Sequence, residues 1–154
     1  MKACTYLQSC AGGIFEGDDL RLRIEAGEGT SAHVTSGAST IVHSMEQEAA
    51  AQCLEIRARE GAFLEYLPDP SILFPRARLD NRVQIIVHPG STVIAGDSLL
   101  LHDPKGGGMF DWQRSETRIS NPRENSRPAT ASASRAARWR AWPEPRPPRA
   151  ACSS

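Results

Sequence analysis

Apolar and polar positions alternate with a period of two on both sides of three glycines, Gly29, Gly61 and Gly90, which lie 32 and 29 residues apart. Alternation of this kind is typical of an extended strand that buries one face. Each segment carries apolar residues seven, five and three positions before its glycine and three and five positions after it. These apolar sets are Leu22, Ile24, Ala26, Ala32 and Val34, then Leu54, Ile56, Ala58, Leu64 and Tyr66, then Val83, Ile85, Val87, Val93 and Ala95.

The repeat predicts an all-β protein. A glycine-bearing turn between two alternating runs is typical of a β-hairpin, and units of about thirty residues bury their apolar faces by packing on one another. We therefore expect three β-hairpins stacked into a layered or β-helix-like scaffold. The alternative is an ordinary β-sandwich in which the regular spacing is a coincidence.

Two connecting segments break the alternation. Residues 39–51 end in residues that favour helix, so we expect a short helix there. Pro68, Pro70 and Pro75 punctuate the link between the second and third repeats, and prolines are poorly tolerated within strands. An irregular loop, rather than a strand, is therefore predicted for that link.

The chain divides near Pro122 into two parts of opposite charge. Residues 1–122 carry 11 Lys and Arg against 16 Asp and Glu, whereas residues 123–154 carry 7 against 2. The second part contains no Ile, Leu, Val, Met or Phe and is rich in Arg, Ala, Pro and Ser, so it cannot build a core. We expect one β domain at 1–122 and a disordered tail at 123–154.

Two other interpretations of the tail remain open. Trp139 and Trp142 lie beside Arg138 and Arg140, and such a basic arm could stack on nucleic acid. We expect no nucleic-acid partner, because this composition more commonly marks disorder. The same composition is also what a GC-rich gene yields when it is translated out of frame, which would make the tail a frameshift product.

Motifs that carry enzyme chemistry are absent from the sequence. It has no nucleophile elbow, phosphate loop or zinc-protease helix, which predicts a protein that is not an enzyme. Its histidines, His33, His43, His88 and His102, show no metal-site spacing, so structural roles are expected and no metal ligand is assigned. With neither an apolar run of about 18 residues nor an apolar leader, we expect a cytoplasmic protein without a membrane partner.

The segment from Gly12 to Asp19 combines glycines with carboxylates. Glycine permits tight backbone turns, so one interpretation is a turn that leads into the first strand. Because carboxylates coordinate divalent metals less tightly than a thiolate cage does, a second interpretation is an acidic patch suited to a cation in transit.

This segment also carries a family resemblance. Ser9 to Asp18 resembles the Gly-Gly-x-x-x-Gly-Asp signature of the UreD (UreH) family of urease accessory proteins. Thr35 to Thr40, Leu64 to Pro70 and Ala95 to Ser98 are similar to later family segments and come in the same order. Ile41 and His43 stand where the family usually has lysine and tyrosine.

The resemblance runs from Tyr6 to Ile119, and family members are longer at both ends, so the chain is similar to a truncated UreD protein. It implies a β-rich scaffold that helps to insert nickel into apo-urease. The implied partners are the urease apoprotein, UreF and the GTPase UreG, and the implied cargo is a transient Ni²⁺ rather than a tightly bound cofactor.

Several positions carry over from the family motifs. Asp18, Asp97 and Thr40 are the candidates for a nickel path. The candidates for motif or partner contacts are Gly12, Gly13, Gly17, Glu65 and Pro68. Two other readings stay open, namely a generic β-repeat binding module that is similar to the family in fold alone, and a gene remnant without function.

Overall fold

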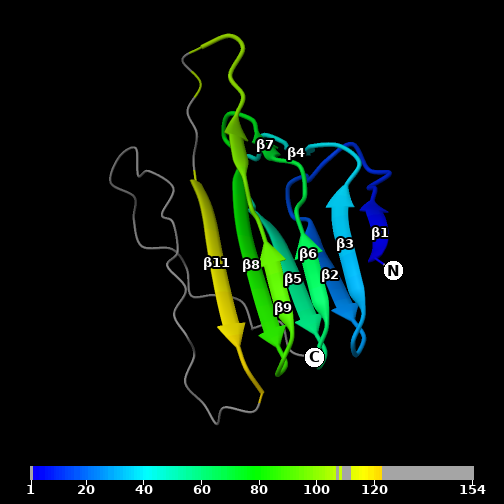
Figure 1. The fold of residues 1–154 in the computed structure, drawn as a ribbon. Coiled ribbons are helices and arrows are strands. Elements are labelled where there is room, and N and C mark those ends of the chain that lie inside the picture. The colour runs from blue at the N-terminus through cyan, green and yellow to red at the C-terminus, as the bar shows by residue number, and fades with distance from the viewer. Residues whose placement is uncertain (1, 107, 109–111, 123–154) are drawn as a thin grey trace.

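The computed structural model describes residues 2–106, 108 and 112–122 (Figure 1). These residues form eleven β-strands and no helix, which confirms the all-β prediction. The strands belong to three parallel sheets, which we call A, B and C. Sheet A contains β1 (Lys2–Leu7), β3 (Ser31–Ser36), β6 (Phe63–Tyr66) and β9 (Thr92–Ala95). Sheet B contains β4 (Thr40–Val42), β7 (Ser71–Leu73) and β10 (Leu99–Leu101). Sheet C contains β2 (Asp19–Ala26), β5 (Ala50–Ala58), β8 (Arg78–Val87) and β11 (Trp112–Ser120).

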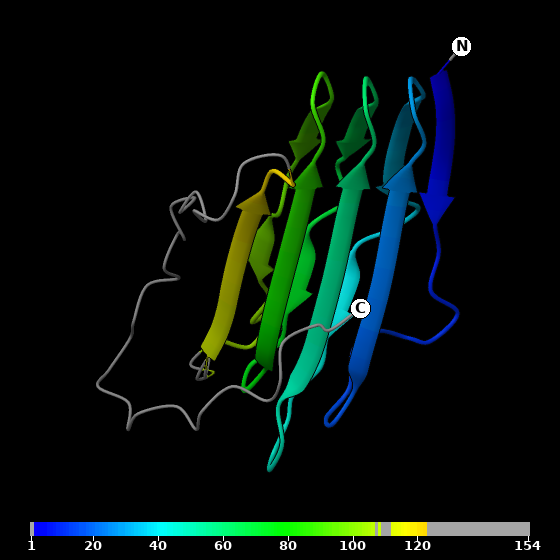
Figure 2. The same ribbon diagram turned by 90° about the horizontal axis from the view of Figure 1, so that it is seen from below.

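The chain winds as a solenoid. Each coil runs through a sheet C strand, then a sheet A strand, then a sheet B strand, and every strand pairs in parallel with its equivalent in the next coil. Leu22 lies opposite Leu54, and Leu54 lies opposite Val83. The predicted stacking of the repeats is therefore confirmed, and Figure 2 shows the coils side by side.

The prediction of hairpins was wrong in one respect. The strands on either side of Gly29 do not pair with each other, because β2 belongs to sheet C and β3 to sheet A. The glycine turns stack instead, with the Gly29 amide donating to the Glu60 carbonyl at 2.9 Å and the Gly61 amide donating to the Pro89 carbonyl at 3.2 Å. Period-two alternation indicates that one face of a strand is buried. The same face is buried whether the strand's hydrogen-bonded partner is adjacent in the sequence or one coil away.

The prediction of a short helix at 39–51 was also wrong. That segment contains β4, an irregular stretch, and the start of β5 at Ala50. Val42 and Met45 are fully buried, and the Met45 amide donates to the Arg76 carbonyl at 3.1 Å. Packing on the neighbouring coil outweighs the local preference for helix, which is only a weak bias.

The proline-rich link between the second and third repeats is not wholly irregular either. It holds β7, which lies between Pro70 and Pro75 and pairs with β4 on one side and with β10 on the other. The prolines flank the strand rather than interrupt its ladder, a placement that prolines tolerate.

Two apolar clusters fill the interior. One lies between sheets A and C near the glycine turns and includes Ile56 and Leu64, both 0% exposed. The other includes Ile14 and Met45 and lies where sheet B meets the start of the sheet C strands. Full burial of such side chains contributes about 1.5–3 kcal/mol each.

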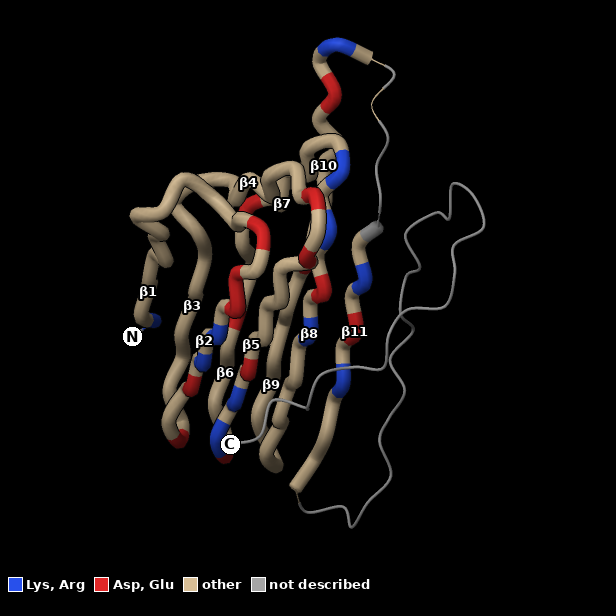
Figure 3. Tube along the Cα trace, turned by 180° about the vertical axis from the view of Figure 1, so that it is seen from behind, with Lys and Arg blue, Asp and Glu red and all other residues tan. Residues whose placement is uncertain are grey.

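The outer face of sheet C is charged. Arginines and carboxylates alternate along its strands (Figure 3), for example Arg57 with Glu55 at 3.1 Å. The described part of the chain contains no helix that could cross a membrane. The predicted tail at 123–154 lies outside the described residues.

Candidate functional site

Gly13 is placed by close backbone packing. The segment between β1 and β2 runs beside β4, where the Ile14 amide donates to the Ile41 carbonyl at 2.7 Å and the His43 amide donates to the Ile14 carbonyl at 2.9 Å. A Cβ on Gly13 would lie 2.4 Å from the Ile41 oxygen, and its φ is +136°. No other residue fits there without displacing the backbone. Gly12 is not confined in this way, since its nearest neighbour would be 4.0 Å away.

Asp18 holds a turn. Its carboxylate accepts the Phe15 amide at 2.8 Å, and its own amide donates to the Phe15 carbonyl at 3.2 Å. Gly17 has φ of +76°, which a turn of this kind requires. The Asp18 carbonyl then accepts the Ala51 amide at 2.7 Å. Asp18 therefore fixes how the chain enters β2, as the turn interpretation of this segment predicts.

Glu16 is a residue that sequence reasoning missed. Its carboxylate accepts the backbone amides of Glu46, Gln47 and Glu48 at 3.1, 2.5 and 2.6 Å. These bonds, that of Glu48 most of all, lower the pKa of Glu16. The sequence carries no signal for this contact, because thirty residues separate the carboxylate from its donors and only the coil brings them together.

Asp97 belongs to a polar cluster at the last described turn between sheets A and B. The Asn81 amide donates to the Asp97 carboxylate at 3.2 Å, and the Ser115 hydroxyl donates to the same oxygen at 3.3 Å. Asn81 is the polar residue found buried among the described residues, with 8% of its surface exposed. Tyr66 lies nearby, and its pKa is raised by burial first and by the charge of Asp97 second.

Thr40 begins β4 opposite Ser71. The three nickel-path candidates thus occupy three places: Asp18 precedes β2, Thr40 starts β4, and Asp97 lies between β9 and β10. The structure brings Asp97 together with Asn81 and Ser115, and it does not bring the three candidates into one cluster. Within the described ranges, no group of three or more His, Cys, Asp or Glu side chains is arranged to hold a metal ion.

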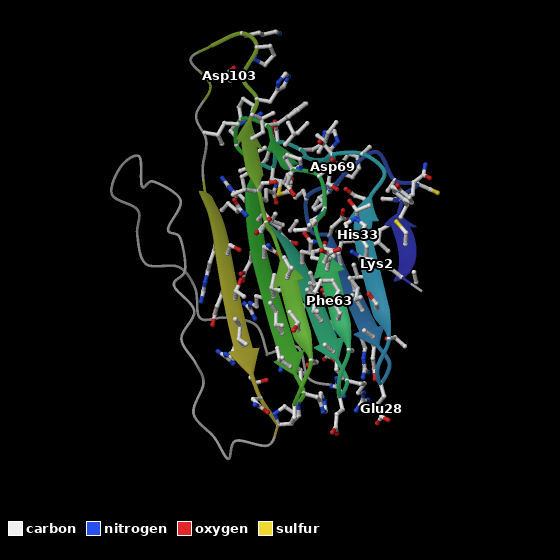
Figure 4. All side chains as sticks on the ribbon, viewed as in Figure 1. Lys2, Glu28, His33, Phe63, Asp69 and Asp103 are labelled. Atoms are coloured by element: carbon white, nitrogen blue, oxygen red, sulfur yellow. The ribbon has the colours of Figure 1, made fainter. Side chains whose placement is uncertain are left out.

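Glu65 lies on the outer face of sheet A. It pairs with Lys2 and accepts the His33 Nδ1 proton at 3.2 Å. His33 lies on β3, the strand next to β6, and Lys2 lies on β1, one strand further along sheet A (Figure 4). The hydrogen bond from Lys2, more than any other influence, lowers the pKa of Glu65. Pro68 is half-buried in the turn that follows β6. Glu65 therefore lies on the surface of sheet A, whereas Pro68 follows Tyr66, whose carbonyl accepts the Gly96 amide at 2.9 Å beside the Asp97 cluster.

An aromatic row follows the edge of sheet B. Phe15 stacks on His43 with ring centroids 4.3 Å apart, His43 meets Phe74 at 5.6 Å, and Phe74 meets His102 at 5.2 Å. His43 Nε2 also donates to the Gly12 carbonyl at 3.0 Å. His43 therefore has the structural role expected of it, with a ring packed between two phenylalanines.

Comparison with known proteins identifies the family. The family model described as UreD urease accessory protein matches residues 2–137 of this chain. The chain belongs to the UreD family. It is 44% identical over 121 residues to urease accessory protein UreD 1 of Pseudomonas syringae pv. syringae (strain B728a), a match that covers 78% of this chain and 42% of the relative.

Other UreD relatives match in the same way. UreD 1 of Pseudomonas syringae pv. tomato (strain ATCC BAA-871 / DC3000) is 44% identical over 121 residues, with 78% of this chain and 42% of the relative covered. UreD 1 of Methylorubrum extorquens (strain PA1) is 43% identical over 110 residues, with 71% and 37% covered. The chain thus spans less than half the length of these curated relatives.

The structure gives the UreD signature a physical meaning. Gly13 allows the segment to pack on β4, Gly17 and Asp18 make the turn, and Glu16 ties that turn to the next coil. Architecture thus explains the signature at Gly13, Gly17 and Asp18, and Glu16 stands at one of its variable positions. The role of Asp97 is different from that of the signature residues, because its carboxylate accepts a hydrogen bond from Asn81 in a polar cluster that lies beside an apolar core.

Proposed function

We propose that this chain acts as a non-catalytic scaffold in urease maturation and assists the transfer of a Ni²⁺ ion into apo-urease. Membership of the UreD family carries this proposal. The proposed partners are the urease apoprotein, UreF and the GTPase UreG, and the proposed compartment is the cytoplasm. The nickel ion is cargo here, held in passing and not as a resident cofactor.

Asp97 is the best supported of the nickel-path candidates. Its carboxylate accepts hydrogen bonds from the Asn81 amide nitrogen and from the Ser115 hydroxyl, and carboxylate and hydroxyl oxygens are ligands that a hard or borderline divalent cation accepts. One carboxylate with neutral neighbours binds weakly, and weak binding suits an ion that must move on. Asp18 fits less well, because its carboxylate accepts a backbone amide and thereby holds the turn before β2, whereas the hydrogen bonds that Asp97 accepts come from side chains.

A pair of matched substitutions tests the role of Asp97. Asp97→Asn removes the charge and keeps the shape, and Asp69→Asn does the same at a turn between sheets A and B one coil earlier, where Asp69 accepts the Ser36 hydroxyl at 3.1 Å. Each variant is produced together with urease subunits, UreF, UreG and nickel. We expect Asp97→Asn to lower urease activity and nickel content, and Asp69→Asn to leave both unchanged.

Docking is measured separately, by co-purification of each variant with apo-urease, UreF and UreG. Equal recovery of the partners with Asp97→Asn and with the unaltered chain would place the defect in nickel transfer. Equal urease activation by both variants would remove Asp97 from the path. Failure to recover any partner with the unaltered chain would contradict the scaffold proposal itself, as the generic binding-module and gene-remnant readings expect.

A further inference from the structure

Two turns that lead into sheet C are built alike. They cover residues 15–18 and 74–77, and in each the amide of the fourth residue donates to the carbonyl of the first, at 3.2 and 3.0 Å. In each, the third residue has a positive φ, which is +76° at Gly17 and +63° at Arg76. The third position of such a type II turn favours glycine. Arginine therefore occupies, at position 76, the place that glycine occupies in the equivalent turn.

The backbone of Arg76 is strained for this reason. Among the residues that the structure describes, Arg76 is the one residue other than glycine with a positive φ. A residue with a Cβ is crowded by the following carbonyl oxygen in this left-handed region, whereas glycine adopts it freely. Strain of this kind is concentrated at functional sites. The side chain of Arg76 is therefore a candidate for a functional role.

Contacts within the described part of the chain do not require arginine at this position. The Arg76 carbonyl accepts the Met45 amide at 3.1 Å, a bond that the backbone of any residue makes. The guanidinium Nη1 lies 3.6 Å from a Glu46 carboxylate oxygen, and the two side chains are 55% and 72% exposed. An ion pair between side chains as exposed as these contributes little to stability. Internal contacts therefore do not explain why an arginine is held in a strained turn.

An apolar sheet face leads up to Arg76. β4 and β7 lie side by side at the end of the coils away from the glycine turns (Figure 1). Each of these strands ends in a buried apolar residue, so Ile41 and Ile72, which come just before those residues, face outward. Phe74 of the aromatic row follows β7 and comes two residues before Arg76. The chain thus presents a cation at the end of an apolar and aromatic surface.

This combination is suited to a protein partner. Arginine and aromatic side chains are enriched at protein–protein interfaces and carry much of their binding energy. The planar fork of a guanidinium binds a carboxylate through two parallel hydrogen bonds. We propose that Arg76 is a docking residue, whose guanidinium binds a carboxylate of a protein partner that packs on the outer face of sheet B. This inference rests on the proposed function, whose partners are the candidates, and it adds the chemistry of the contact.

Two substitutions separate the strain from the guanidinium. Arg76→Gly removes both, whereas Arg76→Ala removes the guanidinium and keeps the strain. In urea unfolding, Arg76→Gly should therefore have the higher midpoint of the two. Equal midpoints would show that position 76 stores no strain, which would overturn the reason for assigning a role to its side chain.

Docking is measured as the affinity of this chain for purified urease apoprotein, UreF and UreG, tested singly and together. For the partner that binds, Arg76→Gly and Arg76→Ala should both weaken the affinity by about tenfold. The two losses should be equal, because both variants lack the guanidinium. Glu46→Gln should strengthen the affinity, since it removes the carboxylate that competes for the Arg76 guanidinium in the free chain.

Arg21→Ala is the matched control. Arg21 lies on the outer face of sheet C, its side chain is 72% exposed, and it pairs with Asp19 at 3.1 Å. Its removal takes away the same charge from a different face, so the affinity should stay unchanged. A loss with Arg21→Ala equal to that with Arg76→Gly would reveal general attraction between charges and would overturn a specific contact at Arg76.

Salt dependence reports the charge at the contact. Screening weakens attraction between exposed charges, so the affinity of the unaltered chain should fall as salt is raised, and that of Arg76→Gly should fall less steeply. Equal slopes would contradict a carboxylate as the group that Arg76 binds.

The remaining outcomes separate this inference from the proposed function. If the unaltered chain, Arg76→Gly and Arg76→Ala all bind the partners equally well, the docking role of Arg76 is overturned and the proposed function stands. Unequal affinities of Arg76→Gly and Arg76→Ala would also overturn that role, because the backbone shape of the turn, and not the guanidinium, would then control docking. An unaltered chain that binds none of the three partners would contradict the proposed function and this inference with it.

Discussion

Gly13 offers the sharpest test of why the chain folds as it does. Gly13→Ala would place a methyl group 2.4 Å from the Ile41 carbonyl oxygen and 3.0 Å from Nε2 of His43. The first of these neighbours is backbone inside a strand, so it cannot swing away as a flexible side chain would. The φ of +136° at this position is also costly for any residue that has a Cβ.

The expected loss of stability can be worked out from these contacts. Holding alanine at such a φ costs about 1–3 kcal/mol. Relieving the clash moves the segment away from β4 and weakens the hydrogen bond from the Ile14 amide to the Ile41 carbonyl, which is 2.7 Å long and contributes about 0.5–1.5 kcal/mol. Part of the burial of Ile14, which is 2% exposed, is lost as well. We expect unfolding to become easier by about 2–5 kcal/mol.

Gly12→Ala is the matched control. It adds the same methyl group one residue earlier, where the nearest atom would be 4.0 Å away, so its effect should stay within about 0.5 kcal/mol. Urea unfolding followed by circular dichroism measures both variants, and a shift in midpoint at constant slope reports stability alone. If Gly13→Ala unfolds at the same midpoint as Gly12→Ala, then close packing on β4 is not the reason for glycine at position 13.

Substitutions at three further positions probe other parts of the fold. Glu16→Gln should lower the stability of the protein at pH 7. The pKa of Glu16 in the folded state is depressed below 4.5, so the stabilisation that its carboxylate gives is present above pH 4.5 and is lost as the pH falls through the depressed pKa. In a pH series, the unfolding midpoints of the variant and the unaltered chain should therefore converge in acid. Ile56→Ala should cost about 2–5 kcal/mol because Ile56 is fully buried, and Ile56→Val about 0.5–1.5 kcal/mol; equal urea midpoints for the two would contradict the core assignment. Asn81→Asp sets a second carboxylate 3.2 Å from Asp97 and should destabilise the protein by about 1–3 kcal/mol at pH 7. Repulsion raises the pKa of one of those carboxyls, so acidification should restore the stability of Asn81→Asp, and a loss that is independent of pH would argue against charge as the cause.

Sequence patterns predicted the architecture better than the site. Positions such as Leu22, Leu54 and Val83 share one register in the structure, as the repeat indicated, because alternation records burial directly. The Asp97 cluster was only partly foreseen. Asp97 itself was named from the resemblance to UreD proteins, but its partners Asn81 and Ser115 come from β8 and β11, and no spacing along the chain marks them as neighbours.

The sequence by itself determined the all-β class, the repeat of about thirty residues, and the positions of the buried faces and turn glycines. These features follow from the chemistry of each residue and its immediate neighbours. Only the tertiary structure decided that the turns join different sheets, that residues 39–51 form no helix, and that Glu16 binds the amides of Glu46, Gln47 and Glu48. Those outcomes depend on which strand lies in the next coil, and that choice is made by contacts between residues some thirty positions apart.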